Sequence, residues 1–176
     1  MDKISVMIPE DEIEKRAKEL AQEISRDYAG KTVHMICVLK GGVYFMTLLS
    51  KYISEDVPVT LDFMSVSSYG NETVSSGIVK IVKDLDQPLE GKDVIVVEDI
   101  IDSGRTLFYL LGILQARKPG SLRLCTLLDK PDRRVCDVSV DYTGFVIEDK
   151  FVVGCGLDYM QKYRNLPYIG VVETEN

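Results

Sequence analysis

The residues best suited to chemistry form a short run at positions 98–106. The run holds three carboxylates and then two hydroxyls around a glycine, in the order Glu98, Asp99, Asp102, Ser103, Gly104 and Thr106. A glycine, hydroxyls and the unpaired backbone N–H groups of a helix start favour the binding of a phosphate. Carboxylates would repel that anion unless they face sugar hydroxyls, a Mg²⁺ ion or a titrating nitrogen. The pattern therefore predicts a site for a phosphorylated sugar.

Two expected elements position this run. The four aliphatic residues Val94 to Val97 are typical of a strand that is buried on both faces. Four leucines follow the run at helical spacing, at positions 107, 110, 111 and 114. Ligands of open α/β sheets bind beyond the carboxyl ends of the strands, so the run is expected at such an edge. A buried strand followed by a solvated acidic turn is the alternative interpretation.

Residues 96–106, Val-Val-Glu-Asp-Ile-Ile-Asp-Ser-Gly-Arg-Thr, resemble the phosphoribosyl-pyrophosphate signature of the type I phosphoribosyltransferases. The likeness is greatest to the hypoxanthine (hypoxanthine-guanine) branch, although Ser103 stands where many relatives have threonine. The resemblance implies that Asp102 manages a proton of the base during catalysis. It also implies a phosphoribosyl and 5′-phosphate site made of Glu98, Asp99, Asp102, Ser103, Gly104, Arg105 and Thr106.

Further motifs that resemble this family imply a pyrophosphate site. The expected strand 32–39 ends in Lys40-Gly41, which matches the family's pyrophosphate loop and its non-proline cis peptide, expected between these two residues. Ser68-Tyr69 matches the Ser-Tyr pair of the loop that closes over the active site, here at about 65–77. Arg164 matches an arginine that contacts pyrophosphate. On their own, the glycine pair and the polar loop would indicate a tight turn and a flexible linker.

The same resemblance implies a purine site near the C-terminus. Its expected members are Lys130 on the 6-oxo group, Phe151 stacked on the base, main-chain groups near Val152, and Asp158. The implied cofactor is Mg²⁺, with Glu98, Asp99 and Asp158 as its protein ligands. Without the resemblance, a phenylalanine in an apolar strand belongs more often to the core.

Composition limits the range of functions. The 176 residues are 45% hydrophobic and carry a net charge of −7, with a pI near 4.8, which argues against a nucleic-acid-binding surface. The sequence has no apolar run long enough for a membrane span and no apolar core of a signal peptide, so we expect a cytoplasmic protein without membrane partners. The four cysteines form no Cys-x-x-Cys pair and are expected to be reduced, and His34 is expected to be structural.

The order of the expected elements predicts an α/β fold with a mainly parallel central sheet flanked by helices, as in the type I phosphoribosyltransferases. We expect one domain over residues 1–176, with a core at about 30–128. A small hood, made of the N-terminal segment and residues from about 129 onward, would cover the strand ends. Helices are expected from about Glu12, capped by Asp11, and over Val43 to Ile53.

The resemblance implies transfer of a 5-phosphoribosyl group from its 1-diphosphate to hypoxanthine, and also to guanine, with release of pyrophosphate. The implied partners are these small molecules and further copies of the chain, as a homodimer or homotetramer. Orotate, uracil and adenine transferases share the core, but Lys130, Phe151 and Asp158 argue against them. The alternative from another class is an RNA-binding regulator or a sugar-phosphate sensor without transferase activity.

Overall fold

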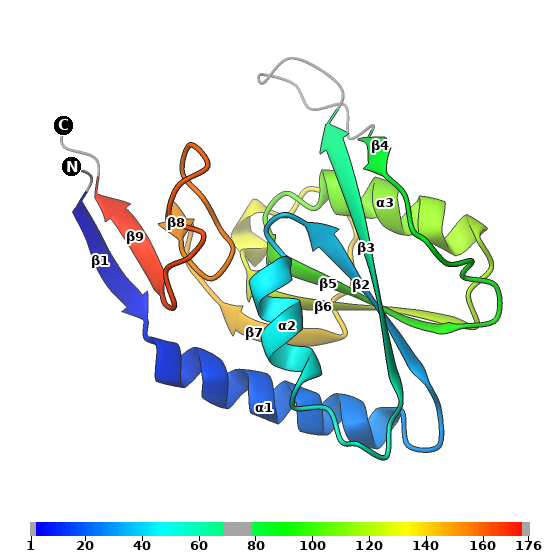
Figure 1. Cartoon of the computed structure of the whole chain (residues 1–176). Helices are drawn as coiled ribbons and strands as arrows, with labels where there is room; N and C mark the ends of the chain where they lie inside the picture. The colour runs from blue at the N-terminus through cyan, green and yellow to red at the C-terminus, as the bar shows by residue number, and fades with distance from the viewer. Residues whose placement is uncertain (1–2, 69–78, 174–176) are drawn as a thin grey trace.

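A computed structural model of the chain describes residues 3–68 and 79–173, and six of its strands form a central sheet (Figure 1). The strands are β2 (Val33–Leu39), β3 (Val59–Ser68), β4 (Val79–Lys83), β5 (Asp93–Ile101), β6 (Ser121–Asp129) and β7 (Tyr142–Val146). Their order in the sheet is β4-β3-β2-β5-β6-β7, and every pair of neighbours except β3 and β4 is parallel. The predicted mainly parallel sheet is confirmed. The carboxyl ends of its parallel strands therefore meet at one edge.

The middle of the sheet is the most apolar part of the fold. Residues 94–97 of β5 are buried on both faces, as their unbroken aliphatic character predicts. Strand β2 beside it is also buried from Val33 to Val38, with Val33 paired to Asp93. These two buried strands lie side by side in the middle of the sheet.

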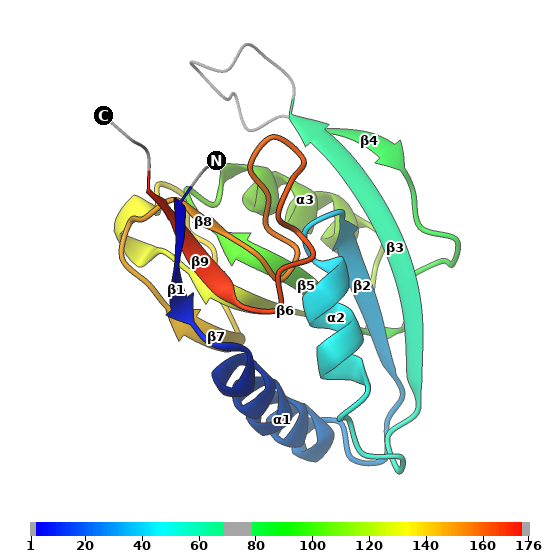
Figure 2. The ribbon, with the colours of Figure 1, turned by 60° about the vertical axis from the view of Figure 1, so that its left-hand side comes forward.

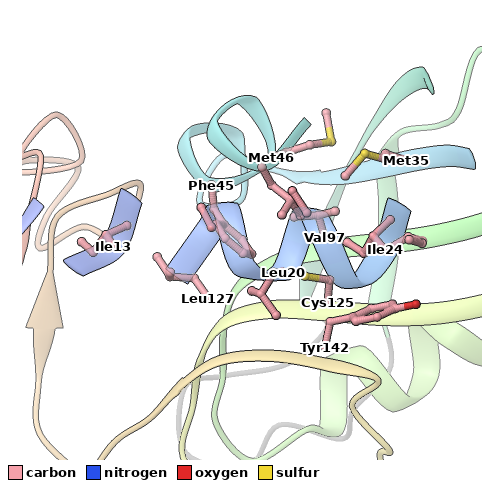
Figure 3. Close-up of a cluster of buried hydrophobic side chains, with 14 of the residues drawn as sticks. Ile13, Leu20, Ile24, Met35, Phe45, Met46, Val97, Cys125, Leu127 and Tyr142 are labelled. Atoms are coloured by element: carbon pink, nitrogen blue, oxygen red, sulfur yellow. The ribbon is translucent and has the colours of Figure 1, made fainter. Parts of the chain in front are cut away.

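Helices cover both faces of the sheet. Helices α1 (Glu10–Asp27) and α2 (Val43–Ser50) pack against one face, where Leu20 and Phe45 meet Val97 in a buried cluster (Figure 3). Helix α3 (Arg105–Ala116) covers the other face through three buried leucines at positions 107, 110 and 114. The chain leaves β2 toward β3 but leaves β5 toward β6 on the opposite side. The carboxyl ends of β2 and β5 therefore flank a topological switch point, where ligands of such sheets bind.

Two helix boundaries differ from expectation. Helix α1 begins at Glu10, after the extended residue Pro9, so Asp11 lies inside the first turn and is not its cap. Acidic residues at positions 10–12 stabilise this end through the helix dipole instead. Helix α2 ends at Ser50 because the next turn tightens, with the Ile53 N–H donating to the Ser50 carbonyl at 3.3 Å.

A second, antiparallel sheet forms the hood. Its strands are β1 (Lys3–Ile8), β9 (Ile169–Glu173) and β8 (Val152–Val153), in the order β1-β9-β8. Figure 2 shows the loop between β8 and β9 beside the start of α2 and the carboxyl edge of the central sheet. The hood thus joins both ends of the described chain over that edge. No helix in the described part of the chain has both the length and the apolar character needed to span a bilayer.

Candidate active site

The turn after β5 is shaped by one glycine. Gly104 has a φ of 82°, in the left-handed region that glycine adopts without strain, and its carbonyl accepts the first hydrogen bond of α3, from the Phe108 N–H at 2.8 Å. A Cβ at position 104 would lie 2.8 Å from Cδ of Arg134. A cavity of about 220 Å³ opens here, and its lining includes Glu98, Asp102, Ser103, Gly104 and Thr106. Five of the seven predicted sugar-phosphate residues therefore line one cavity, while Arg105 is the first residue of α3 and Asp99 is next to Glu98 in β5.

Two adjacent carboxylates lie partly buried at the carboxyl end of β5. Burial raises the pKa of Glu98 well above its usual value, and the charge of Asp99 adds to this effect. Burial also raises the pKa of Asp99, while the Ile100 N–H donates to its Oδ1 at 2.7 Å and lowers the pKa in part. Both groups would be better stabilised as anions by a cation or by hydroxyl donors in the cavity. The pair is therefore suited to bind a sugar or a hard metal ion.

The loop after β2 packs directly against these carboxylates. A Cβ at Gly41 would overlap the carboxylate of Asp99, so only glycine lets the backbone approach this closely. The hood reaches the same place, because a Cβ at Gly156 would overlap the carbonyl oxygen of Gly41. Three segments that are distant in sequence thus meet at the switch point.

The cis peptide of this loop lies one residue earlier than expected. It joins Leu39 to Lys40, whereas the motif led us to expect it between Lys40 and Gly41. Strand pairing continues through Leu39, which is opposite Ser65, so the chain turns at the first peptide bond beyond the strand.

Arg164 belongs to the hood segment between β8 and β9, and its charge lowers the pKa of Asp99 in part. Its Nη2 is 2.9 Å from Oδ1 of Asp158, and its Nη1 donates to the Gly156 carbonyl at 2.7 Å. Gln161 connects Arg164 to the loop after β2, since its Oε1 accepts from Arg164 at 3.3 Å and from Lys40 Nζ at 3.2 Å. The predicted pyrophosphate residues Lys40, Gly41 and Arg164 are therefore neighbours. Sequence analysis missed Gln161, because its turn carries no family motif.

Of the two remaining predicted pyrophosphate residues, only Ser68 is among the described residues. Ser68 is the last residue of β3. Tyr69 lies outside the described residues, as does most of the loop expected to close over the site.

The predicted purine residues come from the segment after β6 and from the hood, and Lys130 is hydrogen-bonded through its backbone N–H to the Ile101 carbonyl at the end of β5. Lys130 is 6% exposed, and its Nζ lies 3.5 Å from Oδ1 of Asp149. Phe151 is 55% exposed and meets the ring of Tyr159 edge to face, with 5.6 Å between the ring centroids. Val152 is buried in β8. An exposed phenyl ring and a buried ammonium group can receive a flat base with a carbonyl oxygen.

The oxygen donors expected to hold a metal ion are not gathered into a cage. Within residues 3–68 and 79–173, no group of three or more His, Cys, Asp and Glu side chains is close enough to bind a metal. The charge of Asp158 nevertheless raises the pKa of Asp99, which places the two carboxylates within electrostatic reach. Glu98, Asp99 and Asp158 offer only oxygen ligands, as Mg²⁺ prefers, but they need further ligands from a bound molecule.

The thiols and the histidine take no part in this site. All four cysteines are free, and burial raises the pKa of the Cys37 thiol to about 12 and that of Cys155 to about 11. His34 is buried near the start of β2, at the other edge of the sheet, where its Nδ1 is 2.7 Å from Oγ1 of Thr60. Proton transfer in the site must therefore involve carboxylates, lysine or the ligands.

Comparisons with known proteins agree with this geometry. A model of the phosphoribosyl transferase domain matches residues 9–160. The hypoxanthine-guanine phosphoribosyltransferase of Bacillus subtilis is 53% identical over 168 residues, covering 96% of this chain and 92% of the relative. A hypoxanthine-guanine phosphoribosyltransferase structure from Bacillus anthracis superimposes with a TM-score of 0.93 at 48% identity, covering 97% of this chain and 100% of that one.

Another relative is a longer protein. The bifunctional protein TilS/HprT of Listeria monocytogenes is 53% identical over 170 residues, which are 97% of this chain but only 26% of the length of that relative. The matched region of this relative thus corresponds to nearly the whole chain. The domain match, the identities and the superposition together establish that the chain belongs to the phosphoribosyltransferase family.

Proposed function

We propose that the protein is a hypoxanthine phosphoribosyltransferase of purine salvage. It transfers the 5-phosphoribosyl group of 5-phospho-α-D-ribose 1-diphosphate to hypoxanthine, and also to guanine, and forms IMP or GMP and pyrophosphate. The observation that carries this proposal is the backbone hydrogen bond at 3.0 Å from the N–H of Lys130, a buried lysine, to the carbonyl of Ile101, which lines the sugar-phosphate cavity. An RNA-binding regulator or a sugar-phosphate sensor would not need a buried lysine joined to that cavity.

The sugar phosphate occupies the cavity after β5. The backbone N–H groups and hydroxyls of residues 103–106 bind the 5′-phosphate at the start of α3. Glu98 and Asp99 accept hydrogen bonds from the ribose hydroxyls. Cleavage of the bond to pyrophosphate develops positive charge at C1 of the ribose, as in other glycosyl transfers, and the nearby carboxylates stabilise that charge.

Cations and backbone groups opposite this cavity bind the leaving pyrophosphate. Lys40, Gly41 and Arg164 approach one another across the hood contact and supply positive charge and a backbone N–H group. Ser68 at the end of β3, together with Tyr69, completes this set. Because pyrophosphate is displaced with its charge neutralised, it becomes a better leaving group.

The base lies between the hood and Asp102. Phe151 stacks on its face, main-chain groups near Val152 and the side chain of Asp158 bind its edge, and Lys130 donates to its 6-oxo oxygen. Asp102 holds and removes the proton of the reacting imidazole nitrogens as the new bond forms.

Mg²⁺ fits the oxygen donors of Glu98, Asp99 and Asp158, provided that the donor substrate contributes the remaining ligands. When bound, Mg²⁺ neutralises negative charge on the pyrophosphate group. The chain's own contribution is to keep two partly buried carboxylates available beside the sugar.

The wider setting follows from the same proposal. The whole chain acts as one catalytic domain in the cytoplasm, with no nucleic-acid or membrane partner, and it assembles as a homodimer or homotetramer. Sedimentation of the purified protein would distinguish these two assemblies. A gel-shift assay with structured RNA, run beside a transfer assay, separates the RNA-binding alternative from an enzyme.

A direct test is nucleotide formation by the purified protein with the sugar donor, Mg²⁺ and a panel of bases. We expect IMP from hypoxanthine and GMP from guanine, and no product from adenine, uracil or orotate. Asp102→Asn should lower kcat by roughly 10²–10³-fold while leaving the KM for the donor nearly unchanged, since a positioned proton acceptor typically contributes ~10²–10⁴-fold. No nucleotide from either oxopurine would overturn the proposal, and an Asp102→Asn variant as fast as wild type would remove Asp102 from its role.

A further inference from the structure

A chain of ion pairs joins the two charged groups expected to handle the base. Nζ of Lys130 lies 3.5 Å from Oδ1 of Asp149, and Oδ2 of Asp149 lies 3.2 Å from Nη1 of Arg133. Nε of the same arginine lies 2.8 Å from Oδ1 of Asp102. Arg133 and Asp149 match none of the family motifs considered above, yet they connect Lys130 to Asp102.

The backbone holds Arg133 next to Asp102. The Lys130 N–H donates to the Ile101 carbonyl at 3.0 Å, and the Val135 N–H donates to the Ser103 carbonyl at 3.0 Å. Residues 130–135 therefore run along the turn after β5. The 3₁₀ helix Pro131–Arg133 lies between these two hydrogen bonds and presents Arg133 from a fixed backbone.

The chemistry of the arginine suits a bridging role. Its guanidinium group carries several donors in one rigid plane, so it can hold two carboxylates at a set separation. The ion pair engages Oδ1 of Asp102, so Oδ2 is the oxygen that would face a nitrogen of the base in the proposed complex. Two cations alternate with two carboxylates along this chain of ion pairs, so their charges balance.

We propose that Arg133 is a positioning residue of the transfer reaction. It orients the Asp102 carboxylate toward the reacting purine and, through Asp149, sets the distance between Asp102 and Lys130. The proposal rests on the proposed function, since it concerns the same base site. Its role is separate from folding because all three side chains of the bridge are about half exposed, at 51% for Arg133, 45% for Asp102 and 50% for Asp149. Ion pairs this exposed contribute little to stability.

The test compares steady-state kinetics and melting temperatures of four proteins: wild type, Arg133→Ala, Arg133→Lys and Arg117→Ala. Arg117 is a matched control, since it pairs with Asp84 at 2.7 Å at the far end of α3. We expect Arg133→Ala to lower kcat about 10-fold, with the KM for the sugar donor within twofold of wild type, because a misplaced catalytic group slows the chemical step. Arg133→Lys should recover part of the loss, because an ammonium group can reach one carboxylate but cannot hold both in a plane. The control should match wild type.

A double-mutant cycle tests the bridge itself. Asp149→Asn should raise the KM for hypoxanthine several-fold, and its effect should be smaller in the Arg133→Ala background if the two residues act as one unit. Additive effects would overturn the bridge. An active wild type with an Arg133→Ala variant of equal kcat would overturn the positioning role alone, as would a loss of kcat matched by a loss of thermal stability. A wild type that forms no nucleotide would overturn the proposed function and the inference with it.

Discussion

In the proposed function, the buried ammonium group of Lys130 discriminates between bases by hydrogen bonding. A protonated lysine has three donors and no acceptor, so it satisfies the 6-oxo oxygen of hypoxanthine but opposes the 6-amino group of adenine. The Lys130 side chain is 7% exposed, so water cannot readily relieve such a mismatch. An unpaired buried polar group costs about 1–3 kcal/mol, which corresponds to discrimination of roughly 10²-fold between the two bases.

Lys130→Ala is therefore expected to lower kcat/KM for hypoxanthine by about 10²-fold and to reduce the ratio of kcat/KM for hypoxanthine to that for adenine. Competition between the two bases, followed by chromatography of the nucleotides, measures this ratio. Lys31→Ala, an exposed lysine at the opposite edge of the sheet, serves as the control. If the variant keeps the full preference for hypoxanthine, the discriminating group lies elsewhere, and the main chain around Val152 becomes the first candidate.

The ionisation of Glu98, a residue of the candidate site, affects the free energy of unfolding of the protein. Its pKa is raised by burial and by Asp99, so its folded-state pKa lies above the unfolded value of about 4.3. The resulting contribution to the free energy of unfolding is fully present below the unfolded pKa and is lost as the pH rises through the folded pKa. At pH 8, well above the unfolded pKa, the Glu98 side chain therefore lowers the free energy of unfolding of the ligand-free protein relative to a neutral side chain at this position.

Glu98→Gln is expected to raise the melting temperature of the ligand-free protein at pH 8 by about 2–4 °C, the shift that roughly 1 kcal/mol produces in a chain of this size. The gain should shrink as the pH falls toward 4, because the wild-type carboxyl then takes up its proton. Calorimetry across this range, with Glu90→Gln as an exposed control, gives the comparison. A variant that melts lower than wild type at pH 8, or a gain that does not depend on pH, would contradict the assignment.

Among the structural elements, the loop after β2 contains a glycine, Gly41, that gives space to a side chain of the neighbouring strand β5. The Gly41 backbone lies against the Asp99 carboxylate of β5, so any side chain at position 41 displaces one of the two. In the proposed function the loop contributes to the pyrophosphate site, whereas the carboxylate belongs to the sugar site. A substitution here therefore alters the relative position of two substrate groups without removing any functional group.

Gly41→Ala is expected to lower kcat/KM for the sugar donor by about 10²-fold, since a displacement of about 1 Å in a catalytic site has this effect. Gly112→Ala on α3 is the matched control, because a Cβ there meets open space and alanine favours a helix by up to about 1 kcal/mol over glycine. Steady-state kinetics with the donor as the varied substrate test both. Donor kinetics unchanged from wild type would show that the loop adapts and that the close approach has no role.

Much of this arrangement was accessible from the sequence at the level of elements. The aliphatic run at 94–97 and the leucines that follow have periods typical of a buried strand and a helix, so β5 and α3 were predictable. The start of α1 was not, because Pro9 and Asp11 both have plausible roles at a helix start and only tertiary packing decides between them. The bridge of Arg133 and Asp149 was also inaccessible, since exposed charges carry no period and their pairing depends on the turn between them.

At the scale of the whole molecule, the proposed Mg²⁺ site needs carboxylates from more than one structural element and further ligands from a bound molecule. Glu98 and Asp99 end β5, whereas Asp158 belongs to the hood, and no described group of side chains forms a closed set of metal ligands. We therefore expect Mg²⁺ to bind the free protein only at millimolar concentrations or more weakly, and the complex with the sugar donor much more tightly, because the diphosphate supplies the missing oxygens.

Titration calorimetry of Mg²⁺ into the protein, with and without the donor, measures this difference. Ca²⁺ under the same conditions indicates whether a small octahedral ion is preferred. A tight stoichiometric site in the absence of donor would contradict the expectation and would point to a preformed cluster of Glu98, Asp99 and Asp158.

The pairing of β1 with β9 also determines how the molecule would yield to mechanical force. Lys3 is opposite Glu173, so the two ends of the described chain leave the hood at the same point, as Figure 1 shows. A force that pulls the two ends apart would act on the hydrogen bonds between these strands in sequence, beginning with the pair nearest the ends. The strands of the hood should therefore separate at low force while the central sheet remains folded. An optical-tweezers experiment would record this as a first, short extension that precedes unfolding of the core.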